Sequence, residues 1–161
     1  IPFLAKLSPP PGRMQQLENT HIWIDYAHTP DALDNALSTL RKHYPEFIIR
    51  VIFGCGGDRD RGKRQIMGKI ASETADSIIL TNDNPRSEDP QSIVDDILAG
   101  TKVEDDVQVI LDRGGAINSA IQTLGEEEAL LIAGKGHETT QVIGSKTLQF
   151  SDVEVALNAI S

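Results

Sequence analysis

The stretch "IIRVIFGCGGDRDRGKRQIMGKIASET", residues 48–74, joins a strand to a helix through a glycine-rich turn. Residues 48–53 form an apolar run rich in β-branched side chains, which is typical of a buried strand. The turn Gly54-Cys55-Gly56-Gly57 follows, and residues 62–74 have a helical pattern. A strand that passes at once into a helix is half of a βαβ unit, so this stretch predicts a parallel sheet.

The same alternation continues on both sides of this stretch. Further strands are predicted at residues 21–26, 77–81, 107–111, 129–133 and 147–150. Helices are predicted from about residue 30, at 90–99, at 115–124 and after Ser151, which is a suitable N-cap. The expected fold is α/β and Rossmann-like, with a mostly parallel open sheet of about six strands and helices on both faces.

Composition limits the classes of function. The 161 residues suit one domain, and a net charge of −9 argues against a nucleic-acid-binding surface. Cys55 is the one cysteine of the chain, which excludes an internal disulfide and fits a reducing compartment. No apolar run is long enough to span a bilayer, so no membrane partner is expected. Because the chain lacks an initiating Met, we expect it to be a fragment of a longer protein.

Polar and charged residues follow four of the predicted strands. Ligands of open parallel sheets bind beyond the carboxyl ends of the strands, so these loops are candidate ligand-binding segments. Asp25 and His28 are either ordinary turn and cap residues or contacts to a ribose. The turn after residue 53 carries Arg59, Arg61, Lys63 and Arg64, which favours anion binding over a merely solvated basic loop.

The chain has no phosphate-binding P-loop. That motif requires G-x-x-x-x-G-K-[ST], and neither Gly134-Lys135-Gly136 nor the stretch at 144–147 supplies it. His137 has no second histidine at metal-binding spacing, so no metal site is expected.

Five motifs, in this order and at these spacings, resemble the C-terminal domain of the Mur ligases. They are GRM at 12–14, DYAHTPDAL at 25–33, GCGGDRDRGKR at 54–64, DNPR at 83–86 and AGKGHE at 133–138. The resemblance implies a bacterial, cytoplasmic, ATP-dependent acid–amino-acid ligase of peptidoglycan biosynthesis. ATP would phosphorylate the D-glutamate carboxylate of UDP-N-acetylmuramoyl-L-alanyl-D-glutamate, and the amine of meso-2,6-diaminopimelate would attack the acyl phosphate.

The resemblance also implies a domain arrangement. An N-terminal domain would hold the UDP-sugar, and a central domain would carry the P-loop and most of the Mg²⁺ site. Residues 1–20 would then be the lead-in from the central domain, and residues 21–161 the C-terminal domain. These other domains are the expected protein partners. The fragment would contain no catalytic residue and would be inactive alone.

Residue roles are carried over by motif position. Diaminopimelate would contact Arg59, Asp83, Asn84, Pro85, Arg86, Gly134 and Glu138. ATP would contact Arg13, Asp25 and His28.

Arg86 is the expected determinant of amino-acid choice, because lysine lacks the distal carboxylate with which a guanidinium pairs. The alternatives are a ligase of the Mur or folylpolyglutamate type with another amino acid, a stand-alone nucleotide- or anion-binding module, and a hydrolase with a metal at Asp58 and Asp60.

Overall fold

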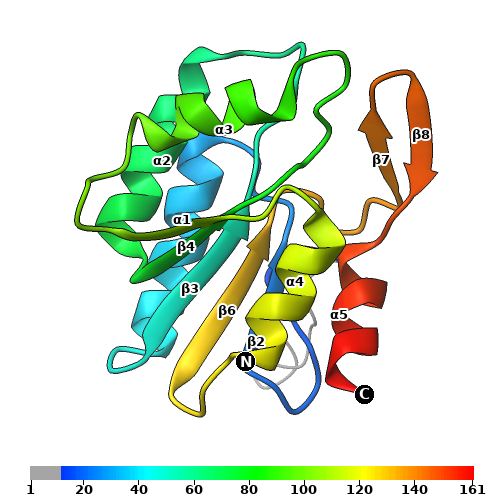
Figure 1. The fold of residues 1–161 in the computed structure, drawn as a ribbon. Helices are drawn as coiled ribbons and strands as arrows, with labels where there is room; N and C mark the ends of the chain where they lie inside the picture. The colour runs from blue at the N-terminus through cyan, green and yellow to red at the C-terminus, as the bar shows by residue number, and fades with distance from the viewer. Residues whose placement is uncertain (1–11) are drawn as a thin grey trace, which may run out of the picture.

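A computed structural model describes residues 12–161. The predicted lead-in at 1–20 therefore lies partly outside the described residues. A six-stranded sheet has the order β1-β2-β6-β3-β4-β5 (Figure 1). All neighbouring pairs are parallel except β1 with β2. The strands are β1 Gln15–Gln16, β2 Ile22–Asp25, β3 Ile48–Phe53, β4 Ser77–Leu80, β5 Asp106–Val109 and β6 Glu128–Ala133.

Five helices cover the two faces of this sheet, as predicted. One apolar core lies under α1 Pro30–His43, α2 Gly62–Thr74 and α3 Pro90–Leu98. A second core lies on the opposite face under α4 Arg113–Gln122 and α5 Asp152–Ile160 (Figure 1). The α/β class and the mostly parallel sheet are confirmed.

Local sequence accounts for where the helices begin. Thr29 caps α1 by accepting from the Ala32 amide, with Pro30 in the first turn. Asp112 caps α4, and Ser151 caps α5 as predicted, by accepting from the Glu154 amide. Asp89 occupies the N-cap position of α3 but makes no side-chain cap bond.

The last predicted strand has a different place from the one expected. Residues 147–150 correspond to β8 Lys146–Gln149, which pairs antiparallel with β7 Thr140–Ile143 in a separate two-stranded sheet. Gly144, with φ of +60°, makes the tight turn between them. The sixth strand of the main sheet is instead the two-residue β1, which is too short to give a periodic signal.

The structure has no helix, among residues 12–161, that is long and apolar enough to cross a membrane.

Candidate functional site

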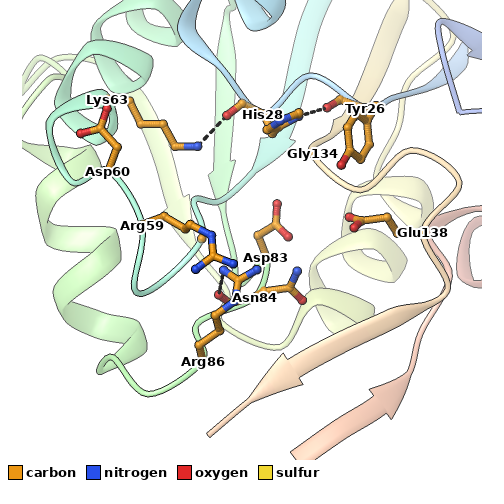
Figure 2. Close-up of a pocket in the computed structure, with 11 residues that line it drawn as sticks. Tyr26, His28, Arg59, Asp60, Lys63, Asp83, Asn84, Arg86, Gly134 and Glu138 are labelled. Carbon is orange, nitrogen blue, oxygen red and sulfur yellow. Dashed lines mark hydrogen bonds between the residues drawn. The ribbon is translucent and has the colours of Figure 1, made fainter.

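The loops after four adjacent strands, β2, β6, β3 and β4, surround one pocket of about 360 Å³ (Figure 2). It lies at the carboxyl edge of the sheet, where the sequence pattern places a ligand site. The lining residues are Tyr26, His28, Gly56, Arg59, Asp60, Lys63, Asp83, Asn84, Arg86, Gly134 and Glu138.

Most of the residues predicted to contact diaminopimelate line this pocket. Arg59, Asp83, Asn84, Arg86, Gly134 and Glu138 do so. Pro85 is buried and does not line it. Of the predicted ATP contacts, His28 lines the pocket, whereas Arg13 and Asp25 do not.

Glycines let the loops after β3 and β4 pack directly against each other. A Cβ on Gly57 would lie 1.8 Å from the Pro85 carbonyl oxygen, and the Gly57 amide donates to the Asn84 carbonyl at 2.8 Å. This contact is between backbones, so a side chain at residue 57 would displace one loop. The GCGG turn therefore serves to seat the loop that carries Asp83 to Arg86.

Gly134 is required for the same kind of reason. Its φ is +120°, and a Cβ there would lie 2.8 Å from Asp83 Oδ2. Only glycine adopts this backbone conformation readily. The loop after β6 thus approaches the Asp83 carboxylate closely enough to form a shared wall of the pocket.

The pocket has a positive side and a negative side. The guanidinium groups of Arg59 and Arg86 point into it from one side, and the carboxylates of Asp83 and Glu138 lie on the other (Figure 2). Arg86 Nη1 donates to the Gly57 carbonyl at 2.9 Å and Arg59 Nη1 to the Asp58 carbonyl at 2.9 Å. Neither arginine takes part in any ion pair between described residues. Both guanidinium groups are therefore available to an anionic ligand.

Arg86 is held in a strained backbone conformation. Its φ is +52°, which is uncommon for a residue with a side chain. Its amide donates to the Val142 carbonyl at 3.0 Å, and its carbonyl accepts from the Gly144 amide at 2.7 Å. The β7–β8 hairpin thus fixes the direction in which the Arg86 side chain leaves the backbone.

The amide of Asn84 has one end occupied. Its Oδ1 accepts from the Val142 amide and from Lys135 Nζ, both at 2.9 Å. The two lone pairs of this oxygen are used, so the Nδ2 group is the end that remains for a ligand. Asn84 can therefore donate to a carboxylate.

The four cations of the loop after β3 have different environments. Arg64 is fully buried and forms ion pairs with Glu88 at 2.8 Å and Asp96 at 3.0 Å. Its guanidinium lowers the pKa of Glu88 to about 2. Arg61 lies 3.5 Å from Asp96. The hypothesis of four clustered anion-binding cations is wrong for Arg64, and the cations of this loop that line the pocket are Arg59 and Lys63.

Asp25 supports the segments that carry the other predicted ATP contacts. Its Oδ1 accepts from the Met14 amide and its Oδ2 from the Ala27 amide, each at 2.8 Å. Asp25 is 8% exposed, so these backbone bonds hold the residues next to Arg13 and His28. Its ribose contact stays a prediction. Arg13 is exposed, and its guanidinium lies 5.1 Å from the centre of the Tyr26 ring.

A buried ion pair connects two of the loops that form the pocket. Arg113 and Asp152 are both fully buried, with Nε to Oδ1 at 2.7 Å and Nη2 to Oδ2 at 2.8 Å. Arg113 also donates to the carbonyls of Asn82 and Ala133, at 3.1 and 3.0 Å. These two carbonyls immediately precede Asp83 and Gly134, so the pair links the loops after β4 and β6.

Asp58 and Asp60, considered above as metal ligands, have structural partners. The Asp58 carboxylate accepts from Ser87 Oγ at 2.8 Å, and Asp60 Oδ1 accepts from the Gly62 amide at 2.9 Å. Within residues 12–161, no group of three or more His, Cys, Asp or Glu side chains is arranged to hold a metal ion.

Sequence reasoning gave no role at this site to Tyr26, which lines the pocket, or to Lys135. Asp60, considered as a metal ligand, also lines the pocket, and Lys63 of the predicted anion-binding loop donates from Nζ to the His28 carbonyl at 2.9 Å. Lys135 is fully buried behind the pocket. A lysine between two glycines, directly after an apolar strand, was the available signal for a buried cation.

The fold and the pocket define an α/β domain whose sheet-edge pocket presents both positively and negatively charged side chains. Comparison with known families gives this domain a class. The family described as "Mur ligase, glutamate ligase domain" matches residues 12–136, so the chain belongs to that family.

Individual relatives extend the match over nearly the whole chain. The UDP-N-acetylmuramoyl-L-alanyl-D-glutamate–2,6-diaminopimelate ligase of Coxiella burnetii is 52% identical and covers 99% of this chain and 34% of its own length. The ligase of the same name from Rickettsia rickettsii is 46% identical over 99% of this chain and 33% of its own length. The chain thus spans about one third of these curated relatives.

Solved structures agree with this placement. A structure of a UDP-N-acetylmuramoyl-L-alanyl-D-glutamate–2,6-diaminopimelate ligase superposes with a TM-score of 0.88 and 42% identity, covering 99% of this chain and 33% of that one. Folylpolyglutamate synthase of Thermotoga maritima, at 24% identity and a TM-score of 0.60 over 79% of this chain and 28% of its own, shares the fold.

Proposed function

We propose that this chain is the C-terminal, amino-acid-binding domain of an ATP-dependent ligase that adds meso-2,6-diaminopimelate to UDP-N-acetylmuramoyl-L-alanyl-D-glutamate. The names of the relatives that match nearly the whole chain support the reaction. In this proposal residues 21–161 are the domain, residues 1–20 lead in from a central domain, and the enzyme is cytoplasmic. The enzyme's own N-terminal and central domains are its partners.

The observation that carries the proposal is the division of charge in the pocket. The non-reacting end of meso-diaminopimelate is itself an amino acid, with a carboxylate and an ammonium on one carbon. Arg86, assisted by Arg59 and the Asn84 amide, is placed to donate to that carboxylate. Asp83 and Glu138 are placed to accept from the ammonium. A ligand with one charge would leave one side of the pocket without a partner.

The contribution of this domain to the reaction is to bind and orient. Holding the distal amino-acid end leaves the other amine free to attack, so only one of two chemically similar amines reacts. ATP, when bound, supplies the phosphoryl group that activates the D-glutamate carboxylate. Magnesium would be held by the central domain, since the P-loop motif is absent from this chain.

Arg13 and His28 are suited to different parts of ATP. Arg13 is an exposed cation, and the His28 Nδ1 is bonded to the Tyr26 carbonyl at 2.8 Å. Because a ring nitrogen facing a carbonyl carries the proton, this tautomer of His28 would present Nε2 as an acceptor, which suits a ribose hydroxyl and not a phosphate oxygen. Asp25 keeps these residues in position through its two backbone bonds.

Glu138 makes the use of diaminopimelate dependent on pH. Burial raises the pKa of the Glu138 carboxyl above its ordinary value, and the nearby Asp83 carboxylate raises it further. A protonated Glu138 carries no charge to offer the ammonium, so kcat/KM for diaminopimelate should fall as pH drops through this raised pKa. Glu138→Gln should lower kcat/KM by about tenfold at neutral pH and abolish this limb of the pH profile.

The matched control for this prediction is Glu127→Gln, an exposed glutamate in the turn before β6. It should leave the profile as in the wild type. A Glu138→Gln enzyme with the wild-type acid limb would show that Glu138 does not contact the ammonium.

The proposed function is tested with the full-length enzyme, ATP and Mg²⁺. Phosphate release is measured with UDP-N-acetylmuramoyl-L-alanyl-D-glutamate and, in separate reactions, meso-diaminopimelate, L-lysine, L-alanine or L-glutamate. Release that requires diaminopimelate, with lysine at least 100-fold poorer in kcat/KM, is the expected result. Preference for another amino acid would refute the proposed substrate.

A further inference from the structure

Lys135 is buried completely, and its ammonium contacts two side chains that line the pocket and one carbonyl of β7. Its Nζ donates to Asn84 Oδ1 at 2.9 Å and to the Thr140 carbonyl at 3.0 Å, and lies 3.3 Å from Asp83 Oδ1. Two of these contacts are hydrogen bonds and the third, with Asp83, is an ion pair. Lys135 does not line the pocket, so its effect on a ligand passes through Asp83 and Asn84.

The contact with Asn84 determines which end of that amide faces a ligand. An Asn side chain has an acceptor end and a donor end, which differ only by a flip. Lys135 and the Val142 amide both donate to Oδ1, and a flipped amide would place its NH₂ group against two donors. Lys135 therefore holds Asn84 with Nδ2 directed toward the ligand.

The contact with Asp83 fixes the carboxylate next to Gly134. The Lys135 ammonium approaches Oδ1, whereas Oδ2 is the atom that a Cβ on Gly134 would meet. Among the described residues, the buried Lys135 ammonium is the ion-pair partner of the Asp83 carboxylate. Loss of this cation would leave a mostly buried carboxylate without that partner.

From these contacts we propose that Lys135 is a positioning residue for diaminopimelate: it orients Asp83 toward the distal ammonium and Asn84 toward the distal carboxylate. The inference rests on the proposed function and adds to it a residue that does not touch the substrate. Lys135 follows a glycine, as the lysine of a phosphate-binding loop does, but it is enclosed by protein groups.

If Lys135 only stabilised the fold, its loss would raise KM for all three substrates alike. The β7–β8 hairpin is also attached to the loop after β4 through the Arg86 and Gly144 amides and through Gln141 Nε2, which donates to the Asp83 carbonyl at 2.9 Å. These bonds do not involve Lys135, so the hairpin has other attachments when the ammonium is removed.

The experiment uses the full-length enzyme with Lys135→Met, which replaces the side chain by an uncharged one of similar length. We expect KM for meso-diaminopimelate to rise on the order of 10- to 100-fold, with KM for ATP and for the UDP-dipeptide within twofold of wild type. Lys146→Met is the control, because Lys146 is an exposed lysine on β8. An unchanged KM for diaminopimelate, or an equal rise for all three substrates, would overturn the proposal.

The pH profile provides a second readout. Glu138 is faced by Lys135, Asp83, His28 and Arg113, and the positive charge of Lys135 lowers the pKa that burial raises. Lys135→Met should therefore move the acid limb of kcat/KM for diaminopimelate to higher pH. In a Glu138→Gln background the same substitution should cause no such movement, and a movement there would contradict this assignment.

Asn84→Asp keeps the proposal testable if Lys135→Met does not fold. The aspartate preserves the acceptor for Lys135 but replaces the Nδ2 donor by a negatively charged oxygen. We expect a loss of at least tenfold in kcat/KM for diaminopimelate with thermal stability close to wild type, whereas wild-type kinetics would overturn the assigned orientation. If the proposed function itself is wrong, the wild-type enzyme will not use diaminopimelate. This result distinguishes that failure from a failure of the proposal for Lys135.

Discussion

Replacing Arg86 by alanine in the full-length enzyme is expected to lower kcat/KM for meso-diaminopimelate by about 30- to 1000-fold. The range corresponds to roughly 2–4 kcal/mol for losing one partner of a desolvated, hydrogen-bonded charge pair. Arg86 Nη1 is bonded to the Gly57 carbonyl, which leaves the rest of the guanidinium for the distal carboxylate. KM for the UDP-dipeptide should change little, since that substrate does not require this contact.

Arg86→Lys should give an intermediate loss, because an ammonium keeps the charge but not the planar pair of donors. The φ of residue 86 is +52°. Alanine and lysine both carry a Cβ, so the two variants keep the same backbone strain and differ only in the side chain. Arg61→Ala is the control for net charge, as Arg61 is an exposed arginine outside the pocket. Undiminished use of diaminopimelate by Arg86→Ala would remove Arg86 from the binding site.

Asp152→Ala is expected to lower the free energy of unfolding of the chain by about 3–5 kcal/mol. The substitution leaves the fully buried guanidinium of Arg113 without its carboxylate partner. Because Arg113 also bonds the carbonyls of Asn82 and Ala133, the loops after β4 and β6 should loosen as well. Urea unfolding followed by circular dichroism measures the change.

Two variants sharpen this stability test. Glu104→Ala, at an exposed glutamate with no ion pair among the described residues, should stay within about 0.5 kcal/mol of wild type. Arg113→Met combined with Asp152→Leu should lose less than Asp152→Ala alone, since no buried charge then remains unpaired. A loss below about 1 kcal/mol for Asp152→Ala would show that water or another group compensates Arg113.

The strand and helix pattern was predictable because most elements have a clear local signal. The β-branched run at residues 48–53 matches β3 in full, and the leucine spacing in α1 places Leu33, Leu37 and Leu40 in the core. The convergence of four loops followed from strand direction alone, since parallel strands end at the same edge. The strands β7 and β1 were missed, because such short strands carry little periodic signal, and β8 was predicted as a strand but counted in the main sheet.

Most of the residues that line the pocket were predictable, but their contacts with one another were not. Sequence placed Arg59, Asp83, Arg86 and Glu138 together, yet could not distinguish Arg64, which is paired and buried, from the cations that face the pocket. Asp25 is predicted as a ligand contact, and its two bonds to the Met14 and Ala27 amides had no signal in the sequence. Burial and pairing depend on residues distant in sequence, and local pattern contains no information on them.

The most direct measurement of the central claim is a crystal structure of the full-length ligase with its UDP-tripeptide product. The distal carboxylate of the diaminopimelate residue should lie within hydrogen-bonding distance of Arg86 and Asn84 Nδ2, and the distal ammonium should lie against Asp83 and Glu138. A product whose distal end points away from this pocket, or lies with its ammonium toward Arg86, would contradict the account.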